Sequence, residues 1–156
     1  MPDALAISLS YLLQRLPERD DWWLIGSGAL KLMGLDVAPH DVDLLTTEDG
    51  GRVILAAIGV EPDVKGADDR FRSSLFKRIK VPGGLDLEIM GGLEVFGAEG
   101  WRWLRPQTRQ PIETPYGNVF VPAACEMLSI LDLFGRPKDM DRAGKLRDHM
   151  ARHVGE

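Results

Sequence analysis

The arrangement of residues 22–46 limits the fold more than any other part of the chain. A short apolar run, residues 22–25, stops at Gly26, and a second apolar run covers residues 41–46. Acidic and apolar side chains alternate at the start of this second run. An alternation of period two predicts a strand, with Asp41 and Asp43 together on one of its faces. The region therefore predicts two strands joined by a glycine turn and a short helix.

The overall composition is that of an ordinary globular chain. The sequence has 156 residues, of which 44% are hydrophobic and 28% are charged, and this length is sufficient to bury a hydrophobic core. We expect a single domain over residues 1–156, with a core at about 20–121 and a helical part at about 122–154. The formal net charge of −5 disfavours non-specific DNA binding, which depends on lysine and arginine neutralising phosphates.

The chain carries no recognisable targeting or membrane segment. Asp3 lies where a signal peptide would have basic residues, and no apolar run approaches the ~18 residues that a membrane span needs. We therefore expect a cytoplasmic protein that does not bind membranes. Cys125 is the single cysteine, which excludes an internal disulfide and a cysteine-based zinc site.

The remaining patterns complete a mixed fold. Apolar periodicity predicts helices at residues 3–16, 48–58, 122–134 and 138–153. Strands are expected at 71–81 and 85–90, joined by a tight turn at Pro82-Gly83-Gly84, and a second small hairpin at 112–121. Residues 91–111 have no clear pattern. This order predicts an α/β (α+β) fold, with a small mixed β-sheet, helices on one face and helices at the C-terminus.

The glycine turn has the chemistry of a phosphate site. Ser27 is a suitable N-cap for a helix over residues 28–33, and the N-terminus of a helix presents free backbone N–H groups and a positive dipole end. Glycines at 26 and 28 would let a phosphate approach the backbone. We therefore assign Gly26, Ser27 and Gly28 to nucleotide binding. The simpler alternative is a helix cap with no ligand.

The paired aspartates have the chemistry of a metal site. Asp41 and Asp43 would lie roughly 6–7 Å apart on one face of their strand, where two negative charges repel unless a cation lies between them. Mg²⁺ prefers such oxygen ligands, although two aspartates at a strand end are also common without a metal. Asp86 and Glu88 share a face of the next strand. Either one would add a third metal ligand or act as a general base on an acceptor hydroxyl.

These residues together resemble a known family. The order Gly26-Ser27, then Asp41-x-Asp43, then Asp86 or Glu88, resembles the nucleotidyltransferase fold of the DNA polymerase β superfamily. It is most similar to small bacterial members, which are antibiotic-modifying enzymes and toxin-type enzymes of abortive-infection systems. The segment Arg136-Pro137-Lys138-Asp139 is similar to an Arg-x-Lys-Asp segment near the C-terminus of those proteins.

The resemblance implies an enzyme that uses Mg²⁺ or Mn²⁺. It would move a nucleoside monophosphate from a nucleoside triphosphate to a hydroxyl on a small molecule, an RNA end or a protein. By the resemblance, Asp41, Asp43 and Asp86 bind the metal, with Glu88 as the alternative third acid, and all four acids are catalytic candidates. Gly26 and Ser27 would hold the β- and γ-phosphates, and Lys138 would lie near the site.

The sequence also departs from this family. Val37 and Pro39 stand where small relatives often have an arginine and a serine or threonine. Cations that could replace the missing arginine are Lys31, Lys77, Arg78 and Lys80. The alternative prediction is an inactive module of the same fold that binds a nucleotide or a protein partner, with a homo-oligomer as one possibility.

Overall fold

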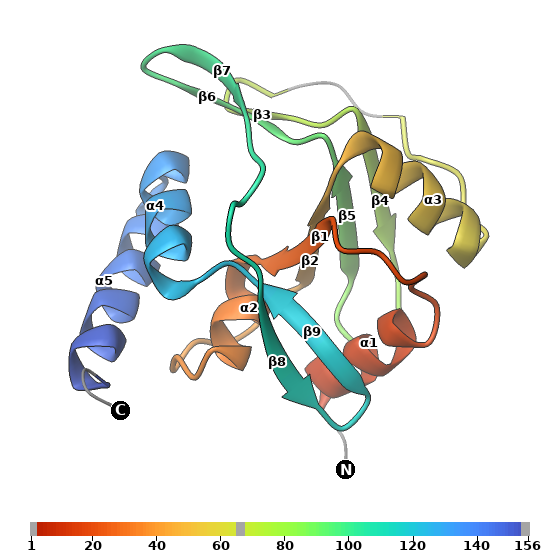
Figure 1. Ribbon diagram of the computed structural model, residues 1–156, viewed down its shortest axis with the longest axis horizontal. Coiled ribbons are helices and arrows are strands. Elements are labelled where there is room, and N and C mark those ends of the chain that lie inside the picture. The colour runs from red at the N-terminus through yellow and green to blue at the C-terminus, as the bar shows by residue number, and fades with distance from the viewer. Residues whose placement is uncertain (1–2, 65–67, 154–156) are drawn as a thin grey trace.

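A four-stranded mixed β-sheet forms the centre of the computed structural model, which describes residues 3–64 and 68–153 (Figure 1). Its strands are β1 (Trp22–Ile25), β2 (Val42–Thr46), β4 (Leu75–Ile79) and β5 (Leu87–Gly91), in the order β1-β2-β5-β4. Strands β2 and β5 run parallel, whereas β1–β2 and β4–β5 are antiparallel. The predicted mixed sheet is therefore confirmed.

The two faces of this sheet differ because its strands alternate. Val42 and Leu44 lie beside Leu87 and Ile89 in the parallel pair, and all four side chains are at most 1% exposed. Asp43 lies beside Glu88 in the same register, one residue along, so that these acids occupy the opposite face. One face therefore belongs to the hydrophobic core, and the other carries the acids that the sequence singled out.

Helix α3 (Glu48–Ile58) packs against the apolar face of the sheet (Figure 1). Its bounds are those predicted from the sequence, because Thr47 caps it by accepting a hydrogen bond from the Gly50 N–H at 2.9 Å, and Gly59 ends it in the left-handed conformation. Gly51 allows the close approach, since a Cβ there would lie 3.0 Å from Leu75 Cδ1.

Two further helices flank the sheet. Helix α1 (Ala4–Leu13) contributes Leu5, Leu9 and Leu12 to the core, and the Ser8 hydroxyl donates a hydrogen bond to the Leu85 carbonyl. Helix α2 (Gly26–Leu32) follows β1 directly. It begins two residues earlier than predicted, and Ser27 is not its N-cap: Ile25 holds that position without a side-chain hydrogen bond. The positive φ of 76° at Gly26 lets the chain turn at once from strand to helix.

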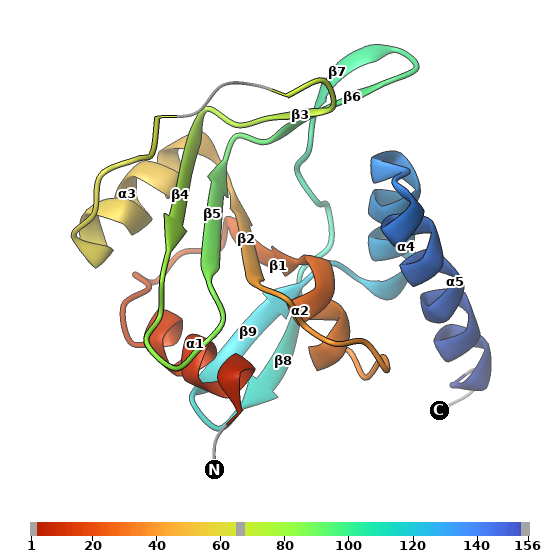
Figure 2. The same cartoon turned by 180° about the vertical axis from the view of Figure 1, so that it is seen from behind.

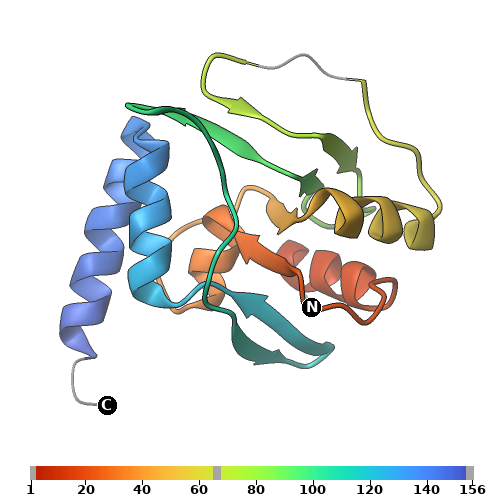
Figure 3. The same cartoon turned by 45° about the horizontal axis from the view of Figure 1, so that its top comes forward.

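Two small antiparallel sheets extend from the central one (Figure 3). One contains β3 (Phe71–Arg72), β6 (Glu94–Gly97) and β7 (Gly100–Trp103), and the other contains β8 (Gln110–Thr114) and β9 (Gly117–Val121). The single strand predicted at 71–81 is wrong in one respect. It breaks at Ser73-Ser74, so β3 and β4 belong to different sheets.

The C-terminal helices α4 (Ala124–Phe134) and α5 (Pro137–Arg152) lie side by side (Figure 2). Gly135, in the left-handed conformation, ends α4, and Pro137 starts α5. Asp139 is 1% exposed and accepts hydrogen bonds from the Arg136 guanidinium at 2.6 and 3.0 Å and from its backbone N–H at 3.2 Å. This acid therefore fixes the first turn of α5.

Within residues 3–64 and 68–153, none of the helices has the length and apolar character required to cross a lipid bilayer. Cys125, at the start of α4, is exposed.

Replacing Asp139 with alanine is expected to destabilise the protein by about 1–3 kcal/mol, because it removes a charge-assisted pair and the cap of α5 together. Urea unfolding followed by circular dichroism measures the loss. The control is Asp141→Ala, since Asp141 is exposed and pairs with Lys145 only at 3.8 Å. Equal losses in the two variants would contradict the role given to Asp139.

Candidate functional site

Three carboxylates meet on the face of the central sheet opposite to Val42 and Leu44. Asp41, Asp43 and Glu88 each place one oxygen within 4.8 Å of the others. Strand register explains the meeting: Asp43 and Glu88 are neighbours in the β2–β5 pair, and Asp41 lies two residues before Asp43, directly ahead of β2. These three residues are called the carboxylate cluster below.

The cluster is electrostatically strained. Burial, together with the charges of Asp41 and Glu88 and a side-chain hydrogen bond with Glu88, raises the pKa of Asp43 to about 8. Burial, and then the charge of Glu88, also raises the pKa of Asp41, while Arg78, Lys138 and His40 oppose that rise. A group of acids that resists losing its protons in this way is relieved by a bound cation.

The cluster fits a hard divalent cation such as Mg²⁺ or Mn²⁺. Asp43 Oδ1 is buried, and no hydrogen-bond partner reaches it among the residues that the structure describes. A buried carboxylate oxygen without a partner is costly, and a cation bound by oxygen ligands would satisfy it. The three acids therefore offer oxygen ligands at a suitable spacing, and they carry negative charge that no hydrogen-bond donor fully neutralises among the described residues.

The glycine turn lies directly against this cluster. A Cβ built on Gly26 would lie 2.4 Å from Asp43 Oδ2, so that any side chain at this position would displace the carboxylate. A Cβ on Gly28 would lie 3.0 Å from the Asp41 carbonyl, which indicates that Gly28 is required for close packing of α2 on the backbone ahead of β2. Helix α2 therefore begins beside the acids, with its N-terminus against Asp43.

Ser27 is buried, and its hydroxyl oxygen already accepts a hydrogen bond within the chain. Its Oγ accepts a hydrogen bond from the His40 backbone N–H at 3.0 Å, and the side chain is 2% exposed. This contact joins α2 to the loop that leads into Asp41. The structure thus gives Ser27 a role in positioning the first aspartate, whereas its predicted contact with phosphates remains a prediction.

Asp86 lies outside the cluster. It accepts hydrogen bonds from Arg78 Nη1 at 3.4 Å and Lys80 Nζ at 3.3 Å. Of the two candidates for the third acid, the structure brings Glu88, and not Asp86, to Asp41 and Asp43. Arg78 also donates to Glu88 through Nη2, so that one guanidinium contacts both acids.

Of the four lysines predicted near the site, Lys80 contacts Asp86, and the other three are placed very differently. Lys77 pairs with Ile89 in the β4–β5 register, which puts it on the face opposite the cluster, where its Nζ donates to Asp63 at 3.0 Å. Lys31 is exposed in the last turn of α2, at the end away from the glycine turn. Lys138, exposed in the first turn of α5, lies close enough for its charge to oppose the rise in the pKa values of Asp41 and Asp43.

Arg78 is the site residue whose position the sequence analysis did not predict, since it was only one of four candidate cations. The signal was present, because Arg78 and Glu88 are equally far from Gly83 in the turn of the predicted hairpin. That symmetry places them directly opposite each other, which the structure confirms. Opposite charges at such positions pair across antiparallel strands.

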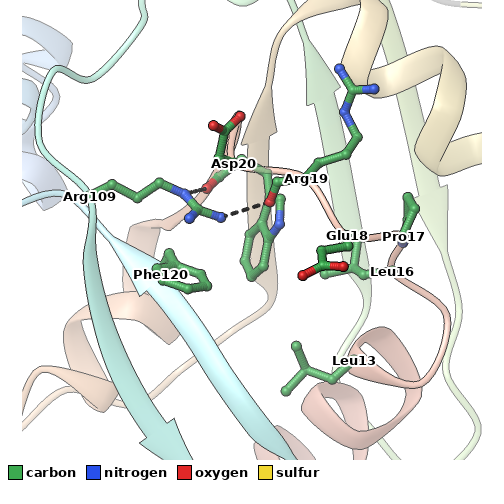
Figure 4. Close-up of a pocket in the computed structure, with 9 residues that line it drawn as sticks. Leu13, Leu16, Pro17, Glu18, Arg19, Asp20, Arg109 and Phe120 are labelled. Atoms are coloured by element: carbon green, nitrogen blue, oxygen red, sulfur yellow. Dashed lines mark hydrogen bonds between the residues drawn. The ribbon is translucent and has the colours of Figure 1, made fainter.

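A hollow in the surface lies away from the carboxylate cluster (Figure 4). An open pocket of about 630 Å³ is lined by Leu13, Leu16, Pro17, Glu18, Arg19, Asp20, Trp22, Arg109 and Phe120. Arg109 donates to the carbonyls of Trp22 and Arg19, at 3.0 and 3.1 Å, and its guanidinium lies 3.6 Å from the Phe120 ring centroid. These contacts hold the loop after α1 against β9. None of Asp41, Asp43 and Glu88 lines this pocket.

Comparisons with known proteins identify the fold. Neither a scan against protein-family models nor a search of curated proteins gave a match. Among solved structures, the chain is similar to a crystal structure described as that of a "putative nucleotidyltransferase" from Thermotoga maritima. The two share 24% sequence identity with a TM-score of 0.67, over 94% of this chain and 92% of the other. At this identity the likeness concerns the fold.

In the absence of divalent cations, stability is expected to fall as pH rises from 5 to 8. Folding raises the pKa of Asp43 from 3.8 to about 8, so the folded chain binds this proton more tightly than the unfolded chain. The stability from this proton is complete below pH ~4 and is lost as pH rises through about 8. In EDTA, the melting temperature should fall by up to about 4 °C per pH unit.

Asp43→Asn should flatten this profile and melt higher than the wild type at pH 8, because the amide carries no charge to bury. Asp132→Asn, at an exposed position on α4, is the control and should keep the wild-type slope. An Asp43→Asn variant with the wild-type slope would show that Asp43 is not the titrating group.

Proposed function

Because this chain has the nucleotidyltransferase fold, we propose that it transfers a nucleoside monophosphate from a nucleoside triphosphate to a hydroxyl acceptor, with Mg²⁺ or Mn²⁺ as cofactor. The observation that carries the proposal is the carboxylate cluster, with its unpartnered buried oxygen on Asp43, directly beside the N-terminus of α2. The fold supplies the general arrangement, and the cluster supplies the chemistry.

In this proposal, Asp41, Asp43 and Glu88 hold the cation. When bound, such an ion neutralises charge on the phosphate oxygens and on the leaving pyrophosphate. The backbone N–H groups at the start of α2, beside Gly26, orient the phosphates, and Lys138 adds positive charge from the first turn of α5. Asp86, which contacts Arg78 and Lys80 instead, has no direct part in holding the cation.

The reaction is an in-line displacement. The acceptor oxygen forms a bond to the α-phosphorus, the bond from that phosphorus to the pyrophosphate oxygen breaks, and the hydroxyl proton passes to a base. Glu88 is suited either to hold the cation or to accept this proton, since it lies at the edge of the cluster with 17% of its side chain exposed. The acceptor is a hydroxyl on a small molecule, an RNA end or a protein.

A second candidate function rests on the pairing of Arg78 with Glu88. If this pair persists, one acid of the cluster stays occupied, and Val37 and Pro39 supply no cation or hydroxyl ahead of Asp41. The same fold would then serve as an inactive module that binds a nucleotide or a protein partner. Nucleotide binding without turnover is the behaviour that would favour this alternative.

Changing any one acid of the cluster is expected to remove the response to nucleotide and cation together. The wild type should gain melting temperature with at least one of ATP, GTP, CTP or UTP in the presence of Mg²⁺, because binding to the folded state raises stability. Asp41→Asn, Asp43→Asn and Glu88→Gln should each lose most of this gain and reduce nucleotide transfer at least ~100-fold. Differential scanning fluorimetry and release of labelled pyrophosphate measure the two effects.

Asp86→Asn is the matched comparison for Glu88→Gln, because the two acids lie two residues apart and both contact Arg78. It should keep most of the thermal response. If Asp86→Asn loses the response and Glu88→Gln keeps it, the third acid is misassigned. If the wild type responds to no nucleotide, nucleotide transfer itself is disproved.

A further inference from the structure

Arg78 joins the carboxylate cluster to an acid outside it. It lies directly opposite Glu88 across the antiparallel β4–β5 pair, and its Nη2 donates to Glu88 Oε1. Its Nη1 donates to Asp86 Oδ2 at 3.4 Å. A single guanidinium therefore spans two acids, of which only Glu88 belongs to the cluster.

A divalent cation and Arg78 would compete for Glu88. Both are positive and both use the oxygens of the same carboxylate, so their mutual repulsion disfavours simultaneous binding at close range. Asp41 and Asp43 have no such competitor, because no basic side chain is ion-paired with either of them among the described residues. Glu88 is therefore the acid of the cluster at which an incoming cation would meet a positive group that is already bound.

The Arg78 guanidinium has a second acid within reach besides Glu88. Asp86 already contacts the guanidinium and offers an anchor when Glu88 is taken. The side chain is 49% exposed, whereas the Arg78 backbone N–H is fixed by a 2.8 Å hydrogen bond to Asp63 Oδ2. The guanidinium is consequently able to turn outward while β4 stays in place.

We propose that Arg78 is a positioning residue that exchanges partners during binding: it neutralises Glu88 in the cation-free protein and turns to the phosphate oxygens of the nucleotide once a cation occupies the cluster. This inference rests on the proposed function. A guanidinium is suited to the second role because it binds phosphate through two parallel hydrogen bonds. Arg78 would thus replace the cationic group that Val37 does not provide.

The exchange predicts how the loss of Arg78 should change two binding affinities, that for the cation and that for the polyphosphate. Arg78 opposes the cation and supports the polyphosphate, so its removal should change the two affinities in opposite directions. A residue that merely stabilises the hairpin would weaken both or leave both unchanged. The difference in sign therefore separates a positioning role from a structural one.

Isothermal titration calorimetry of Arg78→Gln at about 0.15 M salt tests whether the two affinities change in opposite directions. With Mn²⁺ alone, the variant should bind roughly five-fold more tightly than the wild type, as expected for loss of a partly exposed competing ion pair. With inorganic tripolyphosphate in excess Mg²⁺, it should bind roughly ten-fold more weakly, as expected for loss of a charge-assisted contact.

Two variants control for the loss of one positive charge. Lys80→Gln removes a charge that contacts Asp86 at 3.3 Å, and it should change Mn²⁺ affinity less than about two-fold. Arg72→Gln breaks an equivalent cross-strand pair, with Glu94 directly opposite at 3.0 Å in the small β3-β6-β7 sheet, and should change neither affinity. Arg78→Lys should restore the wild-type Mn²⁺ affinity but only part of the tripolyphosphate affinity.

The outcomes separate this inference from the proposed function. If the wild type binds Mn²⁺ but Arg78→Gln binds it no more tightly, or Lys80→Gln tightens it equally, the role of Arg78 is overturned and the function stands. If neither the wild type nor Arg78→Gln binds Mn²⁺, both proposals fail. Thermal unfolding confirms that each variant is folded. If Arg78→Gln is not folded, Arg78→Met, which also removes the charge, replaces it in the same titrations.

Discussion

The parallel pairing of β2 with β5 is the constraint on which the rest of the structure depends. It places Val42 and Leu44 beside Leu87 and Ile89 in the core, and by the same register it places Asp43 beside Glu88 on the opposite face. Slipping the register by one residue would turn the acids into the face that packs under α3 and would turn Val42 and Leu44 towards the site. The hydrophobic core and the carboxylate cluster are therefore two consequences of one alignment.

Much of the fold follows from local sequence signals. The apolar run at β1, the cap and glycine end of α3, and the hairpin between β4 and β5 were all predictable, because each depends on residues close together in the chain. The small β3-β6-β7 sheet was not, although the hairpin that contains β8 and β9 was predicted at 112–121. Strands β6 and β7 have four residues each, and β3 has two, so their pairing depends on tertiary contacts that no local pattern records.

The site was predictable in its acids but not in its details. The period of two along β2 placed Asp41 and Asp43 together, and the hairpin supplied two candidates for the third acid. The choice of Glu88 over Asp86 depends on the pairing of two strands that are far apart in sequence, which alternation alone does not define. The hydrogen-bond partners of Ser27 and Lys77 were not predictable for a similar reason: His40 and Asp63 each lie across a loop from them.

The contact of Asp63 with β4 has a consequence for how the protein can assemble. Strand β4 is at the edge of the central sheet, and an edge strand normally exposes backbone groups that can pair with another chain. Here the Asp63 N–H donates to the Phe76 carbonyl at 2.7 Å, and its carboxylate accepts from the Arg78 N–H. The middle of this edge is already hydrogen-bonded within the chain, which disfavours growth of the sheet into a second molecule along the strand that carries Arg78.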